Sequence, residues 1–216
     1  MLRVGAMSEI ELRIDGTGPD RLVLAHGAGA PMDSPFLESV ARGLAAHGVQ
    51  VVRFEFPYMR ARRLTGRRGP PDPERVLREA WIEVIERMGG AASLVLGGKS
   101  LGGRIASLIA DTARPRGLVC LGYPFHPVGR PERLRTAHLA GLVTPTLIVQ
   151  GERDALGSRE EIARYRLSPA IRLEFLTDGD HSFVPRASAG KTTAENLRHA
   201  VDVVAAFIAG LATPAA

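Results

Sequence analysis

The chain has 216 residues, of which 45% are hydrophobic and 24% charged, a composition typical of a globular protein and not of a disordered one. Its single cysteine, Cys120, excludes an intramolecular disulfide and a cysteine-rich zinc site, and we expect it to be a buried thiol. The net charge of +5 comes from five arginines within residues 57–71, because basic and acidic residues balance elsewhere. The charge therefore gives no reason to expect a nucleic-acid partner.

No apolar stretch approaches the roughly 20 residues that a membrane helix requires. The first 14 residues have no long apolar core followed by a small-residue cleavage site. We therefore expect a cytoplasmic protein without a membrane partner. At this length the simplest division is a single domain over residues 1–216.

Short apolar runs alternate with helical periods along the chain. In order, the predicted strands are residues 9–14, 21–26, 49–56, 93–96, 117–123, 146–151 and 171–176. The predicted helices begin, in the same order, after Ser34, Asp72 and Ser100, near Pro131, and after Ser158 and Thr192. Ser158 with Glu161, and Thr192 with Glu195, form capping boxes. Residues 57–72 are predicted to be an arginine-, proline- and glycine-rich loop.

Strands that alternate with helices predict an α/β fold, with a mostly parallel sheet covered by helices on both faces. Reactive residues in such sheets lie in the loops at the carboxyl ends of the strands. The connection from Tyr123 to the helix near Pro131 is too short for a large cap domain. Candidate catalytic residues are therefore sought directly after each predicted strand.

The stretch LVLGGKSLGGRIAS, residues 94–107, resembles two motifs with unrelated chemistry. A phosphate-binding P-loop needs Gly-x-x-x-x-Gly-Lys-Ser, but Ser93 stands where its first glycine should be, and most of the positions between belong to a predicted strand. Gly98-Lys99-Ser100-Leu101-Gly102 fits Gly-x-Ser-x-Gly in full. We therefore predict that Ser100 is a nucleophile on a sharp turn from strand to helix.

Such a turn holds the serine in a sparsely populated backbone conformation and tolerates only small residues two positions away on either side. Gly98 and Gly102 meet this requirement. The amide of Leu101 lies at the start of the following helix, where the helix dipole favours developing negative charge. On the pentapeptide alone, an idle serine in a glycine-rich turn is the alternative, so its partners decide.

A serine hydroxyl needs a base to activate it and a carboxylate to orient that base. On this kind of sheet the three residues follow in the order serine, acid, histidine. Asp154 follows the strand 146–151, and His181 follows the strand 171–176. We therefore predict a catalytic triad of Ser100, His181 and Asp154.

Three other carboxylates lie near these residues in the sequence. Glu152 directly follows the predicted strand 146–151, two residues before Asp154. Asp178 and Asp180 are so close to His181 that we expect them to shape its loop. Asp154 remains the predicted acid.

A second oxyanion donor is expected after the strand that ends at His26. Small residues over 27–30 would let backbone amides approach a reacting carbonyl closely. We assign this role to the Ala28 amide, beside that of Leu101, with the Gly29 amide as the alternative. His26 is interpreted as a structural residue of the turn and not as a second base.

From about residue 8 to residue 212 these features resemble the α/β-hydrolase superfamily. The motifs that carry the resemblance are HGAGA, GKSLG, QGERD and DGDHSF. HGAGAPMDSPFL and GGKSLGGR are most similar to a small bacterial subgroup, which is similar to eukaryotic proteins related to subunit three of the NSL histone-acetyltransferase complex. In length and in its His-x-Phe motif the chain also resembles dienelactone hydrolases, which have cysteine where this chain has Ser100.

The resemblance implies acyl transfer through an acyl-enzyme on Ser100, without a metal or organic cofactor. A small-molecule ester or thioester is the expected substrate. HGAGA differs from the HGGG of many lipases and esterases, so their substrate range is not transferred. The chromatin-associated relatives imply an alternative, a non-catalytic binding or scaffolding protein with the same fold.

The substrate pocket is predicted from loop positions alone. We expect Tyr58 and Met59 on one side and Phe125 and His126 on the other, around an open and shallow pocket. Lys99 either steadies an anionic group or forms a salt bridge, and we favour the salt bridge. The five arginines, Arg60, Arg62, Arg63, Arg67 and Arg68, attract an anionic substrate, bind acidic macromolecules or form a solvated loop, and we favour the solvated loop.

Overall fold

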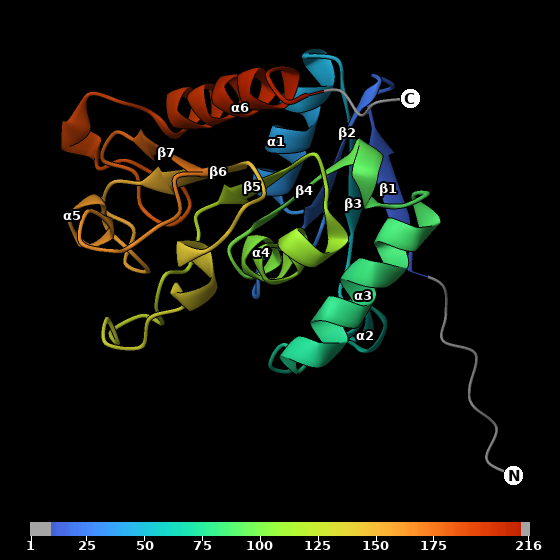
Figure 1. The fold of residues 1–216 in the computed structure, drawn as a ribbon. Coiled ribbons are helices and arrows are strands. Elements are labelled where there is room, and N and C mark those ends of the chain that lie inside the picture. Colours follow the sequence, from blue (N-terminus) through green and yellow to red (C-terminus); the bar gives the residue numbers. More distant parts are fainter. Residues whose placement is uncertain (1–9, 213–216) are drawn as a thin grey trace, which may run out of the picture.

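The computed structural model describes residues 10–212, which form a seven-stranded sheet with helices on both faces (Figure 1). The strands are β1 (Leu12–Asp15), β2 (Asp20–Ala25), β3 (Val49–Phe54), β4 (Leu94–Lys99), β5 (Gly117–Leu121), β6 (Thr146–Gly151) and β7 (Ile171–Leu176). Their order across the sheet is β1-β3-β2-β4-β5-β6-β7. β1 pairs antiparallel with β3, and the other neighbouring pairs are parallel.

The α-helices are α1 (Pro35–Ala46), α2 (Pro57–Thr65), α3 (Glu74–Arg87), α4 (Leu101–Ala113), α5 (Arg159–Ile162) and α6 (Thr193–Ala209). Short 3₁₀ turns are η1 (Ala91–Ser93), η2 (Ala137–Ala140) and η3 (Ala187–Ala189). α3 and α4 pack on one face of the sheet, and α1 and α6 pack on the other (Figure 1). No helix within residues 10–212 is long and apolar enough to cross a membrane.

The central strand β4 shows how the two faces arise from the sequence. Leu94 and Leu96 pack on the α3 and α4 side, whereas Val95 packs on the α1 and α6 side. This alternation follows from the two-residue period of a strand. All three side chains are buried, as expected for a parallel strand covered on both faces.

The sequence predictions of the strands and of most helices are confirmed. Each of the seven predicted strands has a counterpart, although Glu9, the first residue of the predicted strand 9–14, lies outside the described residues. Both predicted capping boxes are present, at Ser158 of α5 and Thr192 of α6. Between β5 and β6 the chain forms turns and η2 only, so no large cap domain covers the sheet edge.

Three local predictions are wrong. Residues 57–65 form helix α2 and not a loop, and Asp72 accepts a hydrogen bond from the Tyr58 amide at 2.7 Å, in the first turn of α2. α3 instead begins after Pro73, without a side-chain cap. No helix begins near Pro131, where the chain runs through turns until η2.

Candidate active site

β4 turns abruptly into α4 at Ser100, whose backbone angles are φ 51° and ψ −112°. A positive φ at a residue with a side chain is a strained conformation that the surroundings must enforce. A Cβ on Gly98 would lie 2.4 Å from backbone atoms of Gly102 and Gly103, and one on Gly102 would lie 2.5 Å from the Ala25 carbonyl oxygen. Only glycine fits at both positions, which is the requirement of a strand-to-helix turn that exposes a serine.

The same turn excludes the P-loop interpretation. Gly97, Gly98 and Lys99 belong to β4 and pair with β2 or β5. A P-loop would need the backbone before the lysine as a free loop around phosphate oxygens. Here that backbone is part of the sheet.

His181 and Asp154 lie in the loops after β7 and β6 and contact each other directly. His181 Nδ1 lies 2.7 Å from Asp154 Oδ2, and Asp154 is fully buried. The carboxylate also accepts a hydrogen bond from Gln150 Nε2 at 2.8 Å and another from the Leu156 amide at 2.8 Å. A carboxylate so placed fixes the proton of His181 on Nδ1 and leaves Nε2 as the basic nitrogen.

Ser100 and His181 line the same cavity, which has a volume of about 520 Å³. No hydrogen bond joins the two side chains within the described part of the chain. Contacts of this kind are often long without substrate and tighten in the complex. The structure thus brings the three predicted residues to one sheet edge, with the acid and histidine already paired.

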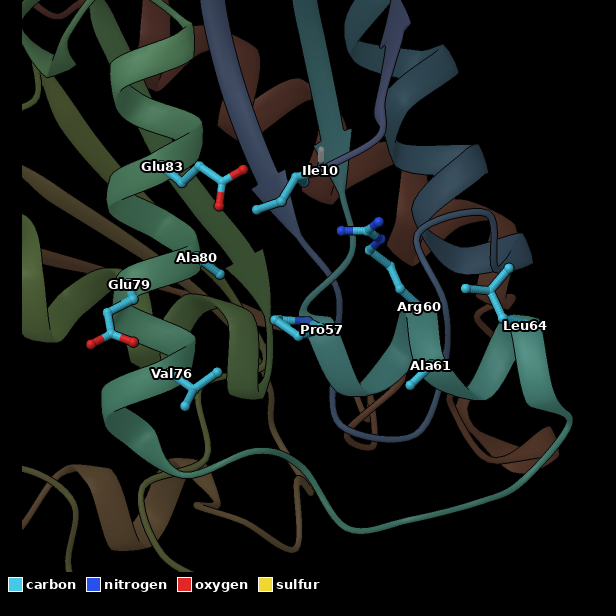
Figure 2. A pocket seen from close by; sticks show the side chains of 9 residues that line it. All are labelled: Ile10, Pro57, Arg60, Ala61, Leu64, Val76, Glu79, Ala80 and Glu83. Atoms are coloured by element: carbon cyan, nitrogen blue, oxygen red, sulfur yellow. The ribbon is translucent and has the colours of Figure 1, made fainter. Parts of the chain in front are cut away.

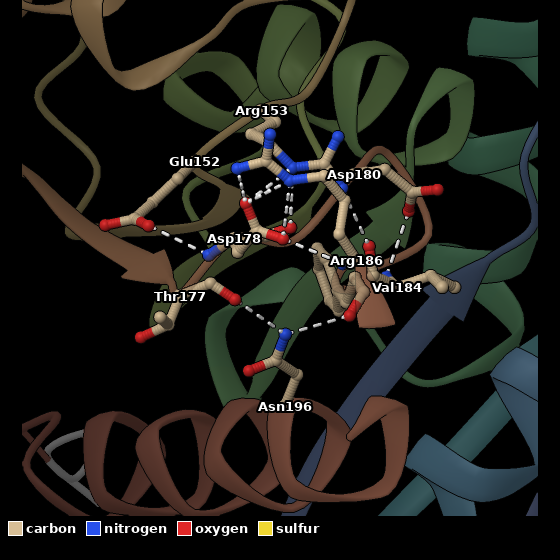
Figure 3. Close-up of polar contacts among 9 residues, drawn as sticks. Glu152, Arg153, Thr177, Asp178, Asp180, Val184, Arg186 and Asn196 are labelled. Atoms are coloured by element: carbon tan, nitrogen blue, oxygen red, sulfur yellow. Dashed lines mark hydrogen bonds and ion pairs between the residues drawn. The ribbon is translucent and has the colours of Figure 1, made fainter. Parts of the chain in front are cut away.

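The rival carboxylates hold the histidine loop in place (Figure 3), whereas the His181 ring hydrogen-bonds Asp154. Asp178 pairs with Arg186 and with Arg153, at 2.5 Å and 2.8 Å. These hydrogen bonds lower the pKa of Asp178 to about 2, with Arg186 the largest cause. Asp180 accepts hydrogen bonds from the Ser182 and Val184 amides.

Helix α6 anchors the same loop from below. Asn196 Nδ2 donates to the carbonyl oxygens of Thr177 and Phe183, at 3.1 Å and 2.9 Å (Figure 3). Asp178 and Phe183 have positive φ angles of 51° and 68°. The loop therefore follows a strained path that its polar contacts must maintain.

The loop after β2 is fixed by contacts to its carbonyl groups. His26 Nδ1 donates to the Gly27 oxygen at 2.6 Å, while His26 Nε2 accepts from the Phe56 amide at 3.1 Å. Burial lowers the pKa of His26, so the ring stays neutral in this structural role. The Tyr58 hydroxyl donates to the oxygens of Gly27 and Ala28, at 3.3 Å and 3.1 Å.

These contacts also orient the candidate oxyanion donors. In a trans peptide the N–H points opposite to the carbonyl oxygen of the same unit. Holding the Gly27 oxygen therefore aims the Ala28 amide the other way, and holding the Ala28 oxygen does the same for the Gly29 amide. Within the described residues, neither the Ala28 nor the Leu101 amide has an acceptor.

The predicted walls of the pocket do not line it. Met59 and Phe125 are buried, with 2% and 0% of their surface exposed, and the Tyr58 hydroxyl is engaged with the loop after β2. His126 is also buried. The cavity is lined instead by Gly27, Ala28, Gly29, Ala30, Ser34, Pro35, Phe36, Leu37, Lys99, Ser100, His181 and Ser182. The start of α1 was not predicted to line the cavity, because it lies beyond the oxyanion loop and does not directly follow a predicted strand.

Lys99 forms no salt bridge with any described residue, so that prediction is wrong. Lys99 Nζ donates to the backbone oxygen of His181 at 2.6 Å. It also lies 5.4 Å and 5.8 Å from the ring centres of Phe36 and Phe183. Burial lowers the pKa of Lys99 to about 8, although the nearby carboxylates of Asp154 and Asp180 oppose this shift.

The arginine-rich segment is partly structural and not simply a solvated loop. Arg63 bonds Asp33, in the loop after β2, and Glu55, just before α2. Arg62 donates to the Gly29 oxygen at 3.2 Å. α2 thus supports the loop after β2.

A second cavity, of about 310 Å³, lies between α2 and α3 and contains none of the candidate catalytic residues (Figure 2).

Comparisons with known proteins agree with this architecture. A family model described as "Alpha/beta hydrolase domain" matches residues 19–209. The chain is similar to an α/β serine hydrolase homologue from Coxiella burnetii, at 18% identity and a TM-score of 0.66, over 94% of this chain and 92% of that one. It is also similar to a dienelactone hydrolase from Anabaena variabilis, at 19% identity and a TM-score of 0.67, over 94% of each chain.

A third similar structure is a serine hydrolase without a lid from Xanthomonas campestris. It is 20% identical, with a TM-score of 0.59, over 96% of this chain and 91% of that one. At identities this low, the similarity to these three structures shows a common fold and nothing finer. The finer similarity to the NSL-related subgroup stays a prediction.

Proposed function

Because the chain belongs to the alpha/beta hydrolase family, we propose that it is a serine hydrolase that cleaves a small carboxylic ester or thioester. The observation that carries this proposal is the 2.7 Å contact between His181 and the buried Asp154, at the wall of the cavity that contains the strained Ser100. A structural serine would need neither the strain nor an oriented imidazole beside it.

In the proposed reaction, His181 Nε2 takes the hydroxyl proton as Ser100 Oγ attacks the substrate carbonyl. The amides of Ala28 and Leu101 stabilise the oxyanion, with the Gly29 amide as the alternative to that of Ala28. Asp154 orients the imidazole and stabilises its positive charge. His181 then protonates the leaving group, and water attacks the acyl-enzyme by the same route.

The cavity supports a small and largely apolar acyl group. Pro35, Phe36 and Leu37 at the start of α1 give the cavity an apolar lining, and Ala28 and Ala30 add small side chains. No described acidic side chain lines the cavity. With no large cap domain to enclose a long chain, short acyl groups are expected to react best.

Hydrolysis of short p-nitrophenyl esters and of acetyl thioesters tests the proposal. S100A should remove turnover while leaving the melting temperature near that of the wild type. Ser182 also lines the cavity, so S182A is a matched control and should retain turnover within about threefold, because it removes no assigned group. Undiminished turnover in S100A would overturn the assignment of the nucleophile.

The competing proposal is a non-catalytic binding protein, and the missing hydrogen bond between Ser100 and His181 is the observation that favours it. A fluorophosphonate probe separates the two, because it labels a serine only when a base activates that serine. Labelling of the wild type at Ser100 supports the enzyme. A wild type that neither reacts with the probe nor hydrolyses any ester of the panel would support the binding protein.

A further inference from the structure

The sequence contains 26 arginines but only two lysines, Lys99 and Lys191. One of these lysines directly precedes the proposed nucleophile and lines its cavity. Arginine and lysine differ in shape, since lysine carries a compact ammonium and arginine a planar fork. A lysine at this one position in an arginine-rich chain suggests that a compact cation is required there.

The space around the Lys99 ammonium is narrow. Its Nζ lies beside the paired rings of Phe36 and Phe183, 5.4 Å and 5.8 Å from their centres, which are 5.3 Å apart. A Cβ on Gly122, just after β5, would come within 2.7 Å of this Nζ and 3.3 Å of His181 Nδ1. The ammonium and the imidazole therefore border the same spot, and the rings favour a cation there.

The Lys99 ammonium also connects two parts of the site. It donates a hydrogen bond of 2.6 Å to the backbone oxygen of His181, the residue that carries the proposed base. The other described hydrogen bonds that leave the histidine loop lead to the loop after β6, through Glu152, Arg153 and Asp154, or to Asn196 of α6. Lys99 instead links this loop to β4, the strand that directly precedes Ser100.

We propose that Lys99 is a positioning residue for His181, and that its ammonium holds the backbone of the base at a fixed distance from the strand that carries the nucleophile. This inference rests on the proposed serine hydrolase function. A hydrogen bond from an ammonium is stronger than one from a neutral amine. The tie is therefore expected to weaken when Lys99 loses its proton.

The charged groups that face Lys99 come from two loops. Asp154 follows β6, while Asp180 and His181 follow β7; the contacts from the start of α1 and the end of β5 are the uncharged Phe36 and Gly122. Burial lowers the pKa of Lys99 to about 8. The cation is thus present at neutral pH and is lost as the pH rises through about 8.

The first experiment compares K99M with K191M in the full chain. Methionine keeps an apolar stem of similar length beside the two rings but removes the donor and the charge. We expect kcat for a neutral p-nitrophenyl ester to fall about 10- to 100-fold in K99M, with KM nearly unchanged, because a misplaced base costs rate and not binding. K191M should match the wild type. A K99M kcat equal to that of K191M would overturn the inference.

The second experiment rebuilds the ammonium. K99C can be alkylated with 2-bromoethylamine to give a thioether analogue of lysine, whereas the native Cys120, 1% exposed, should not react in the folded protein. Complete modification, verified by mass, should restore most of the kcat that K99C loses. Full modification without recovery would show that the kcat lost in K99C does not come from the missing ammonium, and would overturn the inference.

The third measurement uses only the wild type and K191M, so it does not depend on how K99M folds. The rate of fluorophosphonate labelling of the wild type and K191M should decline as the pH rises through about 8, following the Lys99 pKa. A rate that stays constant from pH 7 to pH 10 would overturn the inference. If the wild type neither labels nor hydrolyses esters, the proposed function fails; if it is active and K99M is equally active, only the role of Lys99 fails.

Discussion

The turn at Ser100 and the loop of His181 meet at one cavity but are held by different forces. The serine turn is fixed by backbone contacts so tight that Gly98 and Gly102 have no room for a Cβ. The histidine loop is fixed by side chains, with Asp178 bound by two arginines and Asn196 bound to two carbonyl groups. Substitutions should therefore have an abrupt effect on the first region and a graded effect on the second.

The largest effect is expected for G98A, which tests the backbone half of this comparison. Its Cβ would lie 2.4 Å from backbone atoms that cannot move without shifting α4. We expect ester turnover to disappear and the free energy of unfolding, measured by urea denaturation, to fall by about 3 kcal/mol.

Gly141 provides the control for G98A. It has an ordinary φ of −114° and no atom within 4 Å of an added Cβ. G141A should change the free energy of unfolding by less than about 0.5 kcal/mol. Equal effects of the two substitutions would contradict the steric explanation.

The next largest effect is expected for D154N. The amide keeps the size of the carboxylate but cannot stabilise the positively charged imidazole, so kcat should fall about 10³- to 10⁴-fold. D202N, on the exposed part of α6, is the matched control and should leave kcat unchanged. A loss of less than tenfold in D154N would mean that Asp154 is not the acid.

A smaller and graded effect is expected for D178N, which tests the side-chain half of the comparison. The loosened loop should lower kcat about tenfold through imprecise placement of His181, with little change in KM. The pKa of Asp178 is lowered from 3.8 to about 2 by Arg186 and Arg153. Its carboxylate therefore stabilises the fold above pH 4, and this contribution disappears as the pH falls through about 2.

Melting temperatures at several pH values check the stability part of this prediction. The wild type should melt above D178N at pH 5 to pH 7, and the difference should shrink towards pH 2. A wild-type advantage that is the same at pH 2 and pH 7 would rule out the ion pairs of Asp178 as its cause.

The smallest effect is expected for the double variant R67Q/R68Q. Both arginines follow α2 and are exposed, and neither lines the cavity at Ser100. Turnover of neutral esters should stay within about twofold of the wild type, because salt screens exposed charges that lie outside the cavity. A large loss at physiological salt would assign these arginines a direct part in the reaction.

Part of the fold and of the candidate site could be predicted from the sequence alone. The strands, the capping boxes and the serine turn depend on local patterns, such as glycines two residues from Ser100. The order of Ser100, Asp154 and His181 follows from the topology of a parallel sheet. Local rules and one topological rule were therefore sufficient for these features.

Helix α2 and the pocket walls depend on contacts between distant residues. The composition of residues 57–65 favours a loop, but Asp72 binds the first turn of the helix, and Arg63 reaches Asp33 across 30 positions of the chain. Packing buries Met59 and Phe125, which their loop positions alone did not indicate. The partner of Lys99 is a backbone oxygen, and no sequence pattern identifies such a contact.

The central claim is that Ser100, His181 and the amides of Ala28 and Leu101 act on one reacting group. A crystal structure of the wild type after reaction with a small fluorophosphonate tests this most directly. We expect phosphorus bonded to Ser100 Oγ, with one phosphonyl oxygen about 2.7–3.1 Å from both the Ala28 and Leu101 amide nitrogens. An adduct on another residue, or on Ser100 with that oxygen turned away from both amides, would contradict it.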